Sequence, residues 1–299
     1  MTHRRAVALM VLVTLLWSIA GVVTRHLDAA RSFEVTFWRS LFNALALAVG
    51  LALIRGPTLW RGLIGAGWPL WVSGVCWAVM FTAFMVAITL TTVANVLITM
   101  AIAPLVTALF ARLFLRHRLP VRTWVAITVA GTGIGWMFGS EVGNAGASLI
   151  GTLVALAVPI AAAVNWTVLQ HIRQERADFA GRAPGAAPDM LLAVLIGALL
   201  SAAVSLPLAW PLQANAHDLG LLAVLGVVQL AIPCLLVVQL SRVLPAPEIA
   251  LLALLEVLFG VAWVWLGAGE RPATTALGGG ALVLGALVAN ETLALRRRR

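Results

Sequence analysis

Charge is the scarcest feature of this sequence: 10% of its 299 residues are charged and 62% are apolar, with a mean hydropathy of +1.02. Soluble domains carry about 25% charged and roughly 45–50% apolar residues. A water-soluble chain of this composition would expose large apolar patches and aggregate, and a disordered chain would be poorer in apolar residues. The low charge excludes both classes and leaves an integral membrane protein.

Lysine and tyrosine are absent, and cysteine occurs only twice. Without lysine there can be no glycine-rich phosphate loop with its Lys, and no His-Glu-x-x-His zinc motif occurs. Cys76 and Cys234 both lie inside apolar runs, so neither a disulfide framework nor a zinc site has support. The five histidines lie at the ends of apolar runs or in loops. These absences argue against an enzyme, and we expect no cofactor and no metal.

Apolar runs recur along the whole chain, with glycine, proline and charged residues between them. A helical membrane span needs about 20 mostly apolar residues, and these runs are continuous, unlike the alternating strands of a β-barrel. The sequence therefore predicts an all-α integral membrane protein. Its ten expected transmembrane helices are 6–24, 35–54, 68–88, 93–115, 121–138, 148–169, 190–210, 219–241, 247–267 and 274–294.

All 20 basic residues are Arg, and the formal net charge is +9. These Arg residues stand at the ends of apolar runs, which is typical of membrane topology and anionic headgroups rather than of nucleic-acid binding. With ten spans and the N-terminus inside, only Arg25, Arg31 and Arg271 lie outside and Arg39 lies within a span. The other 16 lie inside, which predicts the inner membrane with both termini cytoplasmic. The apolar stretch 6–23 is longer than that of a usual signal peptide, so we expect it to be retained.

An internal repeat is visible at a shift of 153 residues, which lays segment 76–118 over 229–271 without a gap. Each copy has a span, a tight break, another span and a basic hairpin. Five spans separate the copies, an odd number, so the second copy runs through the bilayer in the opposite direction. Inverted repeats are typical of secondary transporters, whose substrate site lies near the midplane. The expected repeats are two inverted five-helix units, 1–139 and 140–299.

Four segments resemble the EamA-like branch of the drug/metabolite transporter superfamily: 15–18, 37–40, 103–118 with 131–135, and 255–271 with 278–285. The resemblance implies ten helices in two inverted repeats and the export or exchange of small metabolites. Within the superfamily the chain is most similar to bacterial aromatic amino acid exporters. Glu256 is followed by Val257 where the family usually has proline, which argues against a kink in the ninth expected span.

Charged and amide side chains inside the spans are the first candidates for substrate binding. Glu256 lies near the middle of the ninth expected span, where an ionised carboxylate is costly, so it could carry a proton, bind a substrate amine or hydrogen-bond to another helix. Arg39 could bind a substrate carboxylate or extend to the outer headgroups, and Asn43 lies on a polar stripe beside it. The remaining polar candidates, which could instead join helices, are Asn95, Thr99, Asn165 and Gln229.

Aromatic residues and prolines complete the candidate set. Trp17 and Trp77 lie in mid-span, where the interfacial belt of aromatic residues does not explain them. Trp77, Phe81 and Phe84 share one helix face, as in an aromatic-lined pocket or in ordinary helix packing. Prolines inside spans free a backbone carbonyl and favour a cavity, although ordinary kinks are the alternative. The three prolines expected to interrupt helices are Pro104, Pro159 and Pro233.

These features together predict a secondary transporter that exports small metabolites by alternating access around a central cavity. Amino acids are the leading substrate class, with aromatic ones preferred. The expected partners are that small-molecule substrate and the lipid bilayer, without nucleic acid. The alternatives are a drug or nucleotide-sugar carrier of the same fold, or a membrane receptor or scaffold that transports nothing.

The arginine distribution predicts that the 25–31 loop lies outside the cell and the 170–189 loop inside. Single cysteines placed in each loop, in a chain lacking Cys76 and Cys234, report this through an impermeant thiol reagent. In intact cells the reagent should label the first loop and not the second. The opposite labelling would show that the orientation is wrong.

Overall fold

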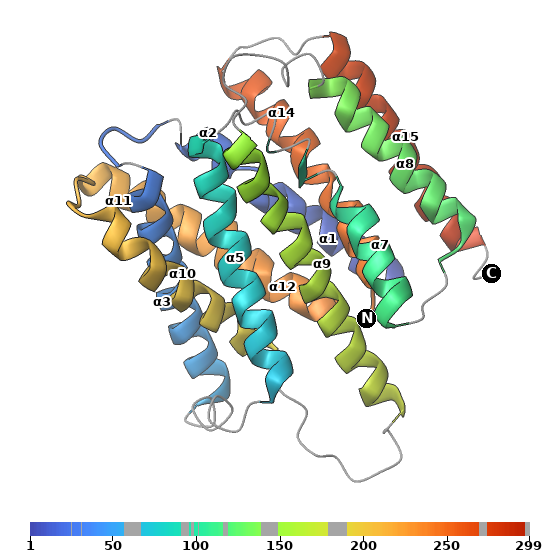
Figure 1. The fold of residues 1–299 in the computed structure, drawn as a ribbon, viewed down its shortest axis with the longest axis horizontal. Coiled ribbons are helices and arrows are strands. Elements are labelled where there is room, and N and C mark those ends of the chain that lie inside the picture. Colours follow the sequence, from blue (N-terminus) through green and yellow to red (C-terminus); the bar gives the residue numbers. More distant parts are fainter. Residues whose placement is uncertain are drawn as a thin grey trace.

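The computed structural model describes residues 1–24, 26–30, 32–56, 67–90, 96, 99–100, 102–115, 119–138, 149–178, 190–268 and 274–296, and these form helices and turns without strands (Figure 1). In chain order the elements are α1 (His3–Trp17), α2 (Ala20–Thr24), α3 (Ser32–Arg55), α5 (Trp68–Leu90), α7 (Ala103–Phe114), α8 (Val121–Phe138), α9 (Leu149–Asp178), α10 (Leu191–Ala209), α11 (Ala216–Val224), the π-helix η1 (Leu225–Ala231), α12 (Ile232–Leu240), α13 (Ala246–Ala253), α14 (Leu255–Ala268) and α15 (Thr274–Arg296).

Helical residues fall within each of the ten expected ranges, as required where no water can satisfy the backbone. Among the described residues, six helical segments are long and apolar enough to cross a membrane: His3–Thr24, Phe33–Leu53, Trp68–Ile88, Leu149–Gln174, Leu191–Ala209 and Ala216–Leu240. Two shorter apolar helices are Ala103–Phe114 and Leu277–Asn290. The two expected basic hairpins, at 117–118 and 270–271, lie outside the described residues.

The helices pack as a bundle with one separate pair at its edge. Figure 1 shows α8 and α15 running side by side, apart from most of the other helices. In the remaining bundle α10 lies against both α3 and α5, and α9 lies against both α5 and α7. The broken α1–α2 segment contacts η1, α12, α13 and α14, and α7 contacts α13. Residues from both halves of the chain therefore meet throughout the interior.

Glycines allow two pairs of these helices to cross at close range. A Cβ added to Gly197 of α10 would lie 2.3 Å from the Cβ of Trp77 and 3.0 Å from the carbonyl oxygen of Gly74 on α5. A Cβ added to Gly226 of η1 would lie 2.7 Å from the carbonyl oxygen of Arg39 on α3. Small residues permit such backbone approach inside membranes. The crossings fix the positions of Trp77 and Arg39, which lie directly at them.

Two of the expected spans are broken helices. The first span breaks between α1 and α2, and two side chains hydrogen-bond to the break. The indole N–H of Trp263 donates to the Ser18 hydroxyl at 2.9 Å, and the amide of Gln229 donates to the Trp17 carbonyl at 3.2 Å. The ninth span breaks at Leu254, so the expectation of no kink there is wrong. Proline is not needed, because Leu254 and Val257 form backbone bonds three residues back, at 3.2 Å each, in place of the helical pattern.

Two buried carboxylates join loops from opposite halves of the chain. Glu34, which is 1% exposed, accepts the backbone N–H groups of Gln213 and Ala214, each at 2.8 Å. Asp218, which is fully buried, accepts three backbone N–H groups from residues 28–30 at 2.8–3.0 Å. Glu34 on α3 therefore binds the loop that precedes α11, and Asp218 on α11 binds the loop that precedes α3. Together the two carboxylates hold α3 and α11 at one end of the bundle.

The glycine crossing of α5 and α10 generates a stability prediction. Gly197→Ala should push the two helices apart and destabilise the protein by about 1–3 kcal/mol, the usual result of overpacking, seen as a lower melting temperature in detergent. The matched control is Gly131→Ala on α8, whose added Cβ would meet nothing within 4 Å. Equal melting temperatures for the two variants would contradict the tight crossing.

Candidate functional site

A cavity of about 150 Å³ lies in the interior of the bundle, where α1, α3, α5, α9, η1, α12, α13 and α14 meet. Its walls are mostly aromatic and aliphatic. Cavities of about this volume take up a benzene-sized guest. Besides the expected candidates given next, its lining includes Met80, Phe84, Met100, Val158, Ala162, Trp166, Leu230, Cys234, Leu254 and Val257.

The structure brings most of the expected site residues to this one cavity. Asn43, Thr99 and Asn165 do not line it, and Asn95 lies outside the described residues. The expected candidates that do line it are Trp17, Arg39, Trp77, Phe81, Gln229 and Glu256, together with Pro159. They come from six different elements, so only the tertiary fold assembles them.

Arg39 and Glu256 are the charged groups of the cavity. Arg39 is only 2% exposed, and its Nη2 donates to the carbonyl oxygen of Phe81 at 2.9 Å. It therefore does not extend to the headgroups, which was the alternative interpretation. Glu256 lies in the first turn of α14, just after the helix break, and is partly exposed to the cavity. The two described side chains line the same cavity but form no ion pair with each other.

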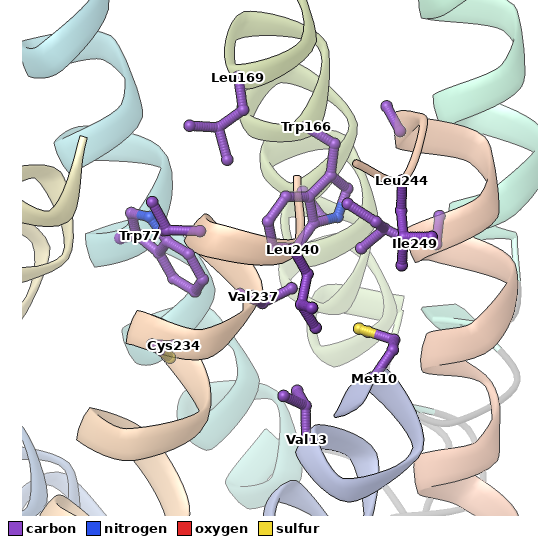
Figure 2. Close-up of a cluster of buried hydrophobic side chains, with 14 of the residues drawn as sticks. Met10, Val13, Trp77, Trp166, Leu169, Cys234, Val237, Leu240, Leu244 and Ile249 are labelled. Atoms are coloured by element: carbon purple, nitrogen blue, oxygen red, sulfur yellow. The ribbon is translucent and has the colours of Figure 1, made fainter. Parts of the chain in front are cut away.

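The aromatic wall is larger than the sequence indicated. The ring centroids of Trp77 and Phe81 lie 5.5 Å apart, and Trp166 of α9 meets Trp77 edge-on at 5.6 Å. Figure 2 shows Trp77 and Trp166 reaching into the interior from two different helices. Sequence reasoning missed Trp166, although a signal existed: Trp166-Thr167 resembles the pair Trp17-Ser18, whose tryptophan was already a candidate. Both tryptophans line the cavity.

Two of the expected polar candidates lie in contacts between helices and not in the cavity wall. Asn165 accepts a hydrogen bond from the Ser73 hydroxyl at 2.6 Å, so its amide joins α9 to α5. Asn43 is fully buried at the crossing of α3 and η1, where its backbone nitrogen lies 2.8 Å from the position of a Cβ on Gly226. On the same stripe, Ser40 shares a hydrogen bond with Ser201 of α10 at 2.9 Å. This polar stripe packs between helices.

The three prolines differ in what they do. Pro159 lies inside α9 and lines the cavity. Pro233 lies in the first turn of α12, where the π-helix η1 gives way to α-helix. Pro104 lies in the first turn of α7, directly after the turn at Ile102 inside the expected span 93–115. A proline fits the first helical turn because its missing N–H has no partner there in any case.

Comparison with known proteins adds to this geometry. Residues 4–139 match the model of the EamA-like transporter family. The match supports the resemblance to the drug/metabolite transporter superfamily, and with the apolar helices it indicates a multi-pass membrane protein. A solved crystal structure matches with a TM-score of 0.77 at 18% identity, covering 98% of this chain and 99% of the other, which shows a shared fold alone. The search of curated proteins gives no match.

Proposed function

We propose that the chain is a secondary transporter of the EamA-like type, with ten membrane spans in two inverted repeats, 1–139 and 140–299. The family match ends at residue 139, the expected boundary. Helix contacts follow the symmetry that such repeats require. The pairs α3–α10, α7–α13 and α8–α15 each join a span of the first repeat to the corresponding span of the second, and the contact between α5 and α9 has its counterpart in the contact between α1 and α12. The helix starts at Ala103 and Leu255 agree with the 153-residue shift to within one residue.

The transported solute is an amino acid, with aromatic side chains preferred. The observation that carries this proposal is that Arg39 and Glu256 line one aromatic cavity without pairing with each other. A guanidinium binds a carboxylate well, and a carboxylate can bind an ammonium group. The wall formed by Trp17, Trp77 and Trp166 offers stacking and burial to a ring. A free aromatic amino acid presents these three features at once.

The other substrate classes fit this cavity less well. A nucleotide sugar carries two phosphate groups, whereas Arg39 is the one cation among the described residues that line the cavity. A cationic drug lacks the carboxylate that Arg39 could bind. A receptor or scaffold that transports nothing has no need of a charged cavity at the meeting point of both halves. Rocking of the two repeats around this cavity would expose it to each side in turn, and the arginine distribution supports an inner-membrane exporter with cytoplasmic termini.

Flux measurements in proteoliposomes test the substrate class. The intact protein should carry tryptophan and phenylalanine better than alanine and threonine. Trp77→Ala should lower aromatic flux about ten- to hundredfold relative to small substrates, because stacking and burial of a ring contribute on the order of 1–3 kcal/mol. Trp71→Ala is the matched control, since Trp71 lies on the same helix but is 49% exposed.

Three results would contradict this proposal or part of it. A parallel fall for all solutes in Trp77→Ala would make Trp77 a structural residue. An intact protein without any preference for aromatic solutes would remove the aromatic part of the proposal, and a protein without flux for any solute would favour the scaffold.

Proton coupling is tested at Glu256. If this carboxylate carries a coupling proton, flux through the intact protein should vary with pH, and Glu256→Gln should abolish that dependence because an amide cannot titrate. Asp28→Asn is the control, since Asp28 is an exposed carboxylate outside the cavity. The same flux-against-pH curve in Glu256→Gln and the intact protein would reduce Glu256 to a hydrogen-bonding residue.

A further inference from the structure

A second cavity, of about 130 Å³, lies between two of the helices that also line the first. On α9, Arg173 lines the second cavity and lies seven residues after Trp166, which lines the first. On α12 and the turn after it, Ser241 lines the second cavity and lies seven residues after Cys234, which lines the first. Seven helical residues span about 10 Å, so the second cavity lies about that far along the same two helices, toward their C-terminal ends. Its lining consists of Leu169, Ile172, Arg173, Met190, Val238, Ser241 and Arg242.

A buried apolar cluster lies between the levels of the two cavities. Val237 and Leu240 of α12 pack there with Met10 and Val13 of α1, and all four are at most 1% exposed (Figure 2). Such a cluster is dry and blocks the passage of a polar solute, as in a closed transporter. The second cavity is therefore separated from the central one by side chains that would have to move.

The charge of the second cavity is positive. Arg173 of α9 and Arg242 of the turn after α12 line it together with Ser241, and no carboxylate among the described residues lines it. The carboxylate that interacts electrostatically with Arg173 is Glu248 of α13, which already contacts His3 of α1. The rest of the wall is apolar. A small anion with an apolar part is the chemistry that this lining fits.

We propose that this second cavity is a carboxylate-binding subsite at the cytoplasmic end of the transport path. It rests on the proposed function: the arginine distribution places this end inside the cell, where an exported amino acid first meets the protein. Arg173 and Arg242 bind the carboxylate while Leu169, Ile172 and Val238 contact the side chain. Movement of the apolar cluster then lets the carboxylate pass from these two arginines to Arg39.

A labelling experiment tests binding without requiring transport. Ser241→Cys, in a chain carrying Cys76→Ser and Cys234→Ser, places a single thiol in the cavity wall. Phenylalanine and 3-phenylpropionate should slow its reaction with a small thiol reagent, whereas phenethylamine, which lacks the carboxylate, should not. Arg173→Gln or Arg242→Gln should weaken protection at least about tenfold in concentration, because hydrogen bonds to a charged group are lost. Arg112→Gln, at an exposed arginine in the last turn of α7, is the control and should change nothing.

Three results would overturn the subsite: no protection by either carboxylate, equal protection in the Arg173→Gln and Arg242→Gln variants, or stronger protection by inorganic phosphate, which would assign the cavity to a phosphate group. The flux assay separates this proposal from the main one. With the subsite correct, Arg173→Gln raises the KM for cytoplasmic phenylalanine about tenfold and leaves kcat nearly unchanged. Absence of amino acid flux in the intact protein contradicts the proposed function, while protection of the thiol still decides whether the carboxylate site exists.

Discussion

The guanidinium of Arg39 can be held inside an apolar bundle only if several neighbours satisfy it at once. Its Nη2 donates to the Phe81 carbonyl, and the carboxylate of Glu256 lines the same cavity. The close crossing at Gly226 packs η1 against the backbone of the same turn of α3. An unpaired charge in a membrane interior is among the costliest groups a protein can contain. The arrangement of α3, α5, η1 and α14 around this one side chain follows from that cost.

The irregular backbone segments lie around the central cavity. The break after Trp17, the break at Leu254 and the π-helix that carries Gln229 all border the same space. Non-regular backbone at membrane depth is tolerated only where protein or water satisfies its polar groups. Here Trp263 and Gln229 donate to the first break, so side chains from the second half of the chain stabilise a discontinuity in the first half.

Hydropathy and helical spacing were enough to locate the helices, and they identified Trp17, Trp77 and Glu256 as residues that the membrane alone does not explain. All three line the cavity. Spacing along one helix cannot tell what a buried polar group meets on another, so Asn165 was grouped with the cavity although Ser73 is its partner. The break at Leu254 was missed because it depends on backbone hydrogen bonding that proline does not control.

The carboxylates of Glu34 and Asp218 also set an order of events during synthesis. Glu34 is made 179 residues before Gln213, whose backbone N–H it accepts. At about 5–20 residues per second, the ribosome needs on the order of 10–40 seconds to supply that partner. During this interval the amino-terminal half must remain in the membrane with the loop end of α3 incomplete. Closure of this end of the bundle is thus among the last steps of assembly, when the chain is already more than two-thirds made.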